Sequence, residues 1–141
     1  MRALPARSAA LSLALLLATV AAGLTLRLAH LSLPSGVTKY GGSALWGLMI
    51  YWIVSFLLPT LQIPSTVLLA GAIATAVEVF KLYHSPGLDA FRLTLPGALL
   101  LGRFFSLWDI AAYWLAIVAG ALADHVIRSH SLISTPAKRL N

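Results

Sequence analysis

The 141-residue sequence contains no cysteine and few charged residues. Without cysteine, the chain can form no disulfide, bind no zinc through thiolates and use no thiol nucleophile. Charged residues make up only 10% of the sequence, whereas a soluble globular domain has about 25%. Hydrophobic residues make up 60%. This composition predicts one integral membrane domain over residues 1–141.

The sequence patterns of familiar catalytic sites are also missing. The chain has no Gly-x-Ser-x-Gly, no His-Glu-x-x-His and no phosphate-loop glycine pattern. Its four histidines lack ligand-like spacing, so we expect no metal and no other cofactor. The formal charge of +6 comes from ten Lys and Arg residues scattered singly between hydrophobic runs. That distribution fits membrane orientation and anionic lipid rather than nucleic acid.

Four apolar runs are each long enough to cross a bilayer. We predict membrane-spanning helices over residues 9–31, 43–61, 64–84 and 107–127. The link at 59–64 is so short that the second and third spans must form an antiparallel hairpin, with Pro64 in the first turn of the third helix. Residues 33–42 contain Pro and Gly and are expected to be a connecting loop.

The first apolar run has two interpretations. A basic start and Val20-Ala21-Ala22 before Gly23 are compatible with a cleaved signal peptide. The apolar character resumes directly after Ala22, which favours a retained membrane helix.

Between the third and fourth spans, the pattern changes to a moderately apolar segment broken by proline and glycine. No single helix can cross a membrane with that punctuation, so residues 87–105 are expected to be interfacial or partly re-entrant, with Asp89, Arg92 and Arg103 at the water side. The predicted fold class is therefore all-α: a polytopic membrane protein with an antiparallel bundle of four transmembrane helices.

The basic residues that flank the spans predict the orientation. One side carries the larger number, which favours a bacterial inner membrane protein with both termini in the cytoplasm. That side has Arg2, Arg7, Arg128, Lys138 and Arg139, and the other has Lys39, Arg92 and Arg103.

The third apolar run contains a carboxylate, Glu78, which must face protein or a wet cavity because lipid offers it no partner. The up-and-down topology brings further ionisable residues to the same outer level. Glu78 lies roughly 9 Å below the end of its predicted helix and Arg27 roughly 6 Å below the end of its own. An ion pair between them is available if the first and third helices touch. Small residues at helical spacing on several spans favour close helix contacts. The complete candidate cluster is Arg27, Lys39, Glu78, Lys81, Asp89, Arg92, Arg103 and Asp109.

Simpler roles are open for several of these residues. Arg27 can snorkel to the interface, and Lys39 can be solvated in its loop. Asp109 follows Ser106 by three residues and can complete a helix capping box. Lys81, one turn after Glu78, can neutralise that carboxylate locally.

Several short motifs, in this order, resemble a family of small bacterial membrane proteins catalogued only as a domain of unknown function. The resemblance covers most of the chain and implies the four-helix topology and the choice of residues, without an activity. The motifs are Gly23-Leu24-Thr25-Leu26-Arg27, Lys39-Tyr40-Gly41-Gly42 with Leu45-Trp46, Glu78 with Leu82-Tyr83, Leu88-Asp89-Ala90-Phe91-Arg92, and Leu101-Gly102 followed by Phe105-Ser106-Leu107-Trp108-Asp109-Ile110.

The chain is more loosely similar to the VanZ-like proteins, known for teicoplanin resistance. The order of Lys39, Glu78, Asp109 and Gly120 matches theirs. Lys81 replaces the usual Gln, and Tyr113 stands where that family has Asn. An ammonium group donates differently from an amide, so the resemblance does not carry a ligand over to this chain.

The positive surplus among the clustered charges favours a non-enzymatic protein. Its outer-leaflet pocket would bind membrane lipid, specifically an anionic head group or a cell-wall intermediate. The alternatives are a membrane enzyme with Glu78 as acid or base on a lipid-linked substrate, a small-solute carrier that would need a homo-oligomer, and a purely structural ion-pair latch. The sequence supplies no nucleophile to accompany Glu78, so an enzyme is the weaker hypothesis.

Overall fold

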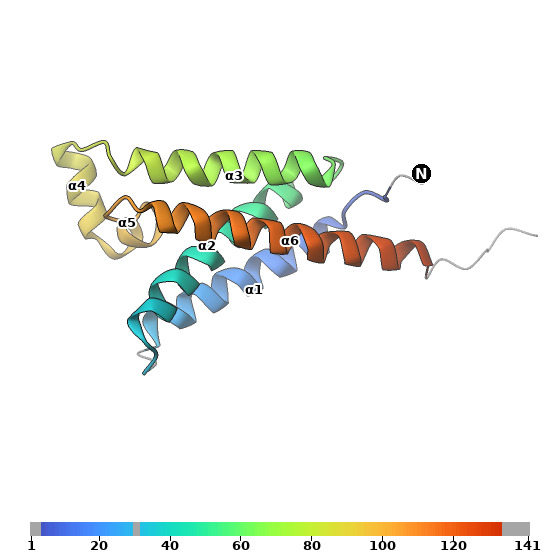
Figure 1. The fold of residues 1–141 in the computed structure, drawn as a ribbon, viewed down its shortest axis with the longest axis horizontal. Coiled ribbons are helices and arrows are strands. Elements are labelled where there is room, and N and C mark those ends of the chain that lie inside the picture. Colours follow the sequence, from blue (N-terminus) through green and yellow to red (C-terminus); the bar gives the residue numbers. More distant parts are fainter. Residues whose placement is uncertain (1–3, 30–31, 134–141) are drawn as a thin grey trace, which may run out of the picture.

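A computed structural model describes residues 4–29 and 32–133, and these residues form six α-helices and no strand (Figure 1). The helices are α1 Ala9–Leu28, α2 Ser35–Leu57, α3 Ile63–Phe80, α4 Pro86–Leu93, α5 Leu95–Leu100 and α6 Leu107–Ile133. Four of them, α1, α2, α3 and α6, are long and apolar enough to cross a membrane. The predicted all-α class with four spans is confirmed, and by length and composition this is a multi-pass membrane protein.

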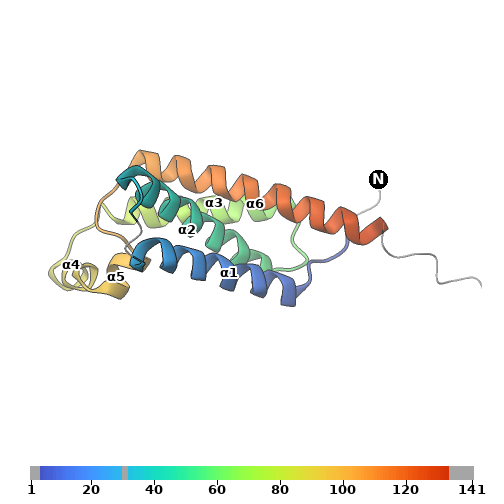
Figure 2. The same ribbon diagram turned by 90° about the horizontal axis from the view of Figure 1, so that it is seen from below.

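The four long helices do not form a symmetric bundle. Helix α2 is central, because it packs against α1, α3 and α6, whereas α1 packs along α2 and does not reach α3. All four converge at the end where the α2–α3 turn lies. Toward the other end, α1 and the first half of α2 diverge from α3, and the short helices α4 and α5 lie at this wide end (Figures 1 and 2).

Glycines sit where the long helices approach one another most closely. A Cβ atom at Gly47 would lie 2.8 Å from the backbone of Tyr113 in α6, and one at Gly71 would lie 2.2 Å from the ring of Trp114. A Cβ atom at Gly120 of α6 would lie 2.7 Å from Leu48 of α2. The small-residue faces expected from the sequence are therefore helix contacts, because hydrogen in place of a side chain lets the helices approach.

Helix α2 begins eight residues earlier than predicted, so the expectation that 33–42 is a loop was wrong. It starts at Ser35, directly after Pro34, and Lys39 is helical. The Thr38 hydroxyl donates to the carbonyl oxygen of Pro34, four residues earlier. A Cβ atom at Gly41 would be 3.0 Å from Leu26 of α1, so this glycine lies at a close helix contact instead of ending a helix.

Helix α3 ends at Phe80, four residues before the predicted end. Beyond it, the N–H groups of Lys81, Leu82 and Tyr83 donate to carbonyl oxygens three residues earlier, so the chain tightens into a turn instead of continuing the α-helix. The Arg92 guanidinium donates to the carbonyl oxygens of Phe80 (3.0 Å) and Tyr83 (2.8 Å) and so stabilises this turn. Arg92 is consequently only 3% exposed, so its expected place at the water side was wrong. Glu78 lies in the last turn of α3, closer to its end than predicted.

The segment between α3 and α6 contains no spanning helix, as the sequence predicted. Helices α4 and α5 have 8 and 6 residues and are too short to cross a bilayer. Helix α6 continues six residues beyond the predicted end of the fourth span. Three predictions lie outside the described residues: the last two residues of the first span, the charge of Arg2, and the charges of Lys138 and Arg139.

Candidate functional site

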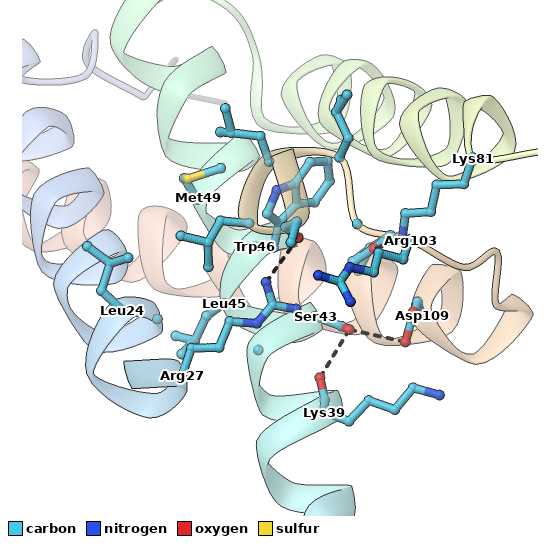
Figure 3. Close-up of a pocket in the computed structure, with 18 of the residues that line it drawn as sticks. Leu24, Arg27, Lys39, Ser43, Leu45, Trp46, Met49, Lys81, Arg103 and Asp109 are labelled. Carbon is cyan, nitrogen blue, oxygen red and sulfur yellow. Dashed lines mark hydrogen bonds between the residues drawn. The ribbon is translucent and has the colours of Figure 1, made fainter. Parts of the chain in front are cut away.

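A cavity of about 890 Å³ lies at the wide end of the molecule (Figure 3). Its walls come from the second half of α1, the first half of α2, helix α5, the 101–106 connection and the first turns of α6. Most lining side chains are apolar, including Leu24, Leu45, Trp46 and Met49. The volume is at the upper end of the range of ligand pockets, about 300–1,000 Å³.

Five of the eight candidate residues line this cavity: Arg27, Lys39, Lys81, Arg103 and Asp109. The other three, Glu78, Asp89 and Arg92, do not. The cavity wall thus carries four cationic side chains and one carboxylate, although its members come from three long helices and two connections.

Three of these cations have no carboxylate partner. Among the described residues, no ion pair within 4.0 Å involves Arg27, Lys39 or Arg103. Arg27 donates to the carbonyl oxygen of Ala98 (3.3 Å), and Arg103 donates to that of Arg92 (3.3 Å). Lys39 lies over the ring of Tyr40, 5.1 Å from its centre. All three side chains belong to exposed residues and retain unused donors.

The chain has four acidic residues, and none of them pairs with Arg27, Lys39 or Arg103. Glu78 pairs with Lys81 and Asp124 with Arg7, while Asp89 accepts from Arg92 and contacts His84. Asp109 accepts a hydrogen bond from the Ser43 hydroxyl (3.1 Å). Glu78 therefore balances Lys81, and Asp109 is the only carboxylate on the cavity wall beside Arg27, Lys39 and Arg103, which leaves a positive surplus there.

Glu78 joins α3 to the start of α6. One carboxylate oxygen accepts from the backbone N–H of Ser106 (2.8 Å), and the other accepts from the Tyr113 hydroxyl (2.7 Å) and pairs with Lys81. The residue is 0% exposed. The N-terminus of α6 also favours a negative charge at this point. The carboxylate is thus held by an ion pair and two hydrogen bonds, and it does not face the cavity.

The Arg27–Glu78 ion pair is not formed, because it required contact between the first and third long helices. Helices α1 and α3 do not touch, and α2 lies against both. Lys81, on the same helix end as Glu78, supplies the charge instead. Lys81 also lines the cavity, so it connects the Glu78 cluster to the cavity wall.

Asp109 forms only half of a capping box. Its backbone N–H donates to the Ser106 hydroxyl (3.4 Å), but the Ser106 N–H donates to Glu78 and not to the Asp109 carboxylate. The carboxylate accepts from Ser43 of α2 and lines the cavity (Figure 3). Capping therefore does not explain why an acid stands at this position.

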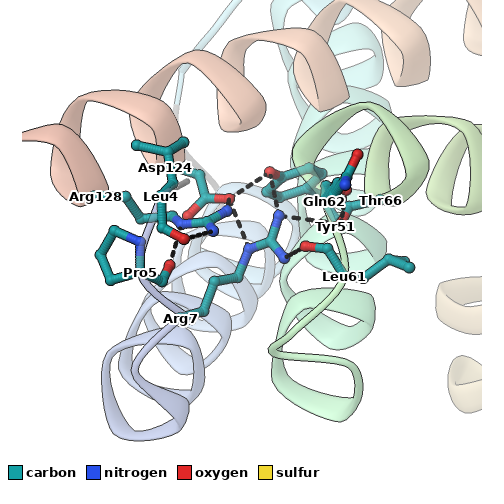
Figure 4. A network of polar contacts seen from close by, with 9 residues as sticks. All are labelled: Leu4, Pro5, Arg7, Tyr51, Leu61, Gln62, Thr66, Asp124 and Arg128. Atoms are coloured by element: carbon teal, nitrogen blue, oxygen red, sulfur yellow. Dashed lines mark hydrogen bonds and ion pairs between the residues drawn. The ribbon is translucent and has the colours of Figure 1, made fainter. Parts of the chain in front are cut away.

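A second polar network lies at the opposite, narrow end (Figure 4). Arg7 donates to Asp124 (2.6 Å), to Thr66 (3.0 Å) and to the carbonyl oxygen of Leu61, and Tyr51 donates to the same oxygen of Asp124 (2.9 Å). All four side-chain members are buried. This network joins the segment before α1 to α2, α3 and α6.

Sequence reasoning missed this network, although a signal was available. Asp124 is an acid inside an apolar run, and the argument applied to Glu78 applies equally to it. Arg7 was interpreted only as a flanking charge. The two residues are 117 positions apart, so no local pattern connects them.

The arrangement favours binding of an anion and offers no obvious metal site. Within the described residues, no three His, Asp or Glu side chains lie close enough together to hold a metal ion.

No solved structure matches this chain. A protein family described as "Protein of unknown function (DUF2809)" matches residues 32–117, from just before α2 to the middle of α6. The matched part contains the cavity residues of α2, α5 and α6 and the Glu78 cluster, and it excludes Arg7, Arg27 and Asp124. The match covers more than half of the sequence, and it bears out the family resemblance noted from the motifs. The chain belongs to this family of proteins of unknown function.

Proposed function

We propose that this protein binds an anionic amphiphile, either a lipid head group or a lipid-linked envelope intermediate, in the cavity at its wide end. The supporting observation is the charge balance of the cavity wall. Arg27, Lys39 and Arg103 line it without carboxylate partners. Glu78, Asp89 and Asp124 form their ion pairs with other cations, and Asp109 is the one carboxylate on the wall.

The apolar part of the wall supports an amphiphile over a free anion. Leucine, tryptophan and methionine side chains line the cavity beside the cations. A phosphate on the cations and the upper hydrocarbon on this apolar wall would satisfy both kinds of surface. The proposed setting is the outer leaflet of a bacterial cytoplasmic membrane, with both termini on the cytoplasmic side.

The contacts of Glu78 support a structural role rather than acid–base catalysis. Its two oxygens already accept from three donors, and it is fully buried away from the cavity. A general base needs access to the proton that it removes. We therefore do not assign a reaction to this cluster.

The test is lipid binding by the purified full chain in detergent, measured by native mass spectrometry with phosphatidylglycerol. Arg27→Gln and Arg103→Gln should each lower the affinity about tenfold, because a hydrogen bond to a charged group contributes about 1.5–3 kcal/mol. Any cation near a membrane attracts anionic lipid, so a variant without a charge change is also needed.

Two glycines of α2 provide that matched pair. Gly42 lines the cavity, Gly36 does not, and a Cβ atom at either position meets nothing within 4 Å. Gly42→Phe should fill part of the cavity and abolish binding, whereas Gly36→Phe should bind as the wild type does. Wild-type affinity in Gly42→Phe would refute the proposal.

A further inference from the structure

Asp109 is the one acid on a cavity wall that otherwise carries cations. Its residue is 7% exposed, and among the described residues it has no ion pair within 4.0 Å. A pure anion in the cavity would be repelled by this carboxylate. Its presence needs a reason beyond anion binding.

The local contacts remove the usual structural reason. An acid three residues after a helix-starting Ser ordinarily accepts from the N–H of that Ser. Here Glu78 accepts from the Ser106 N–H, at 2.8 Å. Asp109 instead accepts one hydrogen bond from Ser43, at 3.1 Å, and a carboxylate has about four acceptor positions. The side chain thus has acceptor capacity left beside the cavity.

The position also places this carboxylate beside the cations of the cavity wall. Asp109 lies in the first turn of α6, where the helix dipole stabilises negative charge. Ser43 lies one helical turn after Lys39 and holds the carboxylate next to the cationic wall (Figure 3). A charged acceptor is therefore placed within the same cavity as the unpaired cations.

We propose that Asp109 recognises a hydrogen-bond donor on the head group, so that the ligand is a phosphodiester lipid bearing a hydroxyl or ammonium group near its phosphate. This inference rests on the proposed function and specifies its ligand. The cations would bind the phosphate, and Asp109 would accept from the donor. Lipids with a bare phosphate or a fully alkylated head group would lack that contact.

Two pairs of lipids with matched charge test the inference on the wild-type protein. Phosphatidylglycerol and phosphatidylmethanol are both monoanionic, but only the former has head-group hydroxyls. Phosphatidylethanolamine and phosphatidylcholine are both zwitterionic, but only the former has N–H donors. Native mass spectrometry of the full chain with an equimolar mixture of each pair gives the relative affinities directly. We expect the donor-bearing lipid to be preferred about tenfold in at least one pair, and that pair identifies the donor.

Asp109→Asn is the matched variant. Asn keeps an oxygen that can accept from Ser43 and replaces the other oxygen with an NH₂ donor. In this variant the two lipids of the pair should bind about equally. Binding of phosphatidylmethanol should be kept or strengthened, because a repulsive charge is gone. Equal binding within both wild-type pairs, or a preference that persists in Asp109→Asn, would overturn the inference.

The outcomes separate the two proposals. In the first case, Arg27→Gln and Gly42→Phe weaken binding of every anionic lipid, but the wild type binds both members of each lipid pair equally. Only the role of Asp109 then fails. If those two variants bind as the wild type does, the cavity itself is not the site, and both proposals fail.

Discussion

Replacement of Glu78 by Gln tests which cation balances the buried carboxylate. Glu78 accepts from Ser106 and Tyr113 and pairs with Lys81. Gln has one acceptor oxygen, so it can keep the Ser106 bond and turn its NH₂ group toward the Tyr113 hydroxyl, which can also accept. The ion pair is then the contact that is lost.

The cost of that loss can be estimated from burial. The Lys81 side chain is 8% exposed, and after the substitution its ammonium has only the Tyr113 hydroxyl at 3.5 Å. Removal of one member of a buried pair costs about 3–5 kcal/mol, because a charge is left without compensation. Lys81 also lines the cavity, where water can reach it, so we expect the free energy of unfolding to fall by about 3 kcal/mol.

A second substitution identifies the stranded charge. Glu78→Gln combined with Lys81→Met removes that charge and should recover about 2 kcal/mol, since a neutral pair of similar size is often as stable as the ion pair. Glu78→Gln combined with Arg27→Met is the control and should recover nothing, because α1 and α3 do not touch. The free energies would be measured by reversible unfolding in mixed micelles. Recovery by the Arg27 substitution and not by the Lys81 substitution would refute the assignment of partners.

Two further predictions concern stability. Arg7→Ala and Asp124→Ala should each lower the free energy of unfolding by about 3–5 kcal/mol. The double variant should lose less than the sum of the two, because the two side chains form one buried pair. Additive losses in the same unfolding assay would contradict that coupling. Gly71→Ala should lower the free energy of unfolding by about 1–3 kcal/mol, because a methyl group would overlap the Trp114 ring. Gly42→Ala has open space around its Cβ atom and should be neutral or stabilising by up to about 1 kcal/mol. Equal effects of the two substitutions would show that helix packing is not the cause.

The helices were predictable because hydrophobic runs of membrane length are a strong signal. The ends of α2 and α3 were not predicted, and each has a physical reason. Gly41 reads as a turn residue in a soluble chain, but in α2 it lies at the contact with Leu26. The turn that ends α3 is stabilised by Arg92, twelve residues after Phe80, which donates to the Phe80 carbonyl oxygen. Such contacts between separate elements leave no trace in local periodicity.

The cavity residues were partly predictable for a similar reason. Antiparallel topology placed five ionisable residues at one end, and all of them except Glu78 line the cavity: Arg27, Lys39, Lys81 and Asp109. Pairing was not predictable, because it depends on which helices touch. In a symmetric up-and-down bundle α1 would neighbour α2 and α6 and lie diagonally across from α3; here α1 packs on α2 and reaches neither α3 nor α6. Lys81 is the nearest cation along the chain and took the place that had been assigned to Arg27.

The two buried carboxylates explain why the cations at the cavity are left over. Glu78 fixes the start of α6 to α3, and Asp124, near the other end of α6, binds Arg7 from the segment before α1. Helices α3 and α6 are thereby joined at the wide end by Glu78, and at the narrow end Tyr51 adds α2 to the Asp124 network. Helix α1 is held through α2, through Arg7 at its beginning and through the single hydrogen bond of Arg27 to α5 at its end. Lys81 and Asp109 consequently stand at the joined ends of α3 and α6, whereas Arg27 stands on α1, which contacts neither of these two helices. An anion bound as proposed, in contact with Arg27 and Lys81, would therefore bridge two parts of the fold that are otherwise connected only through α2, α5 and the segment before α1.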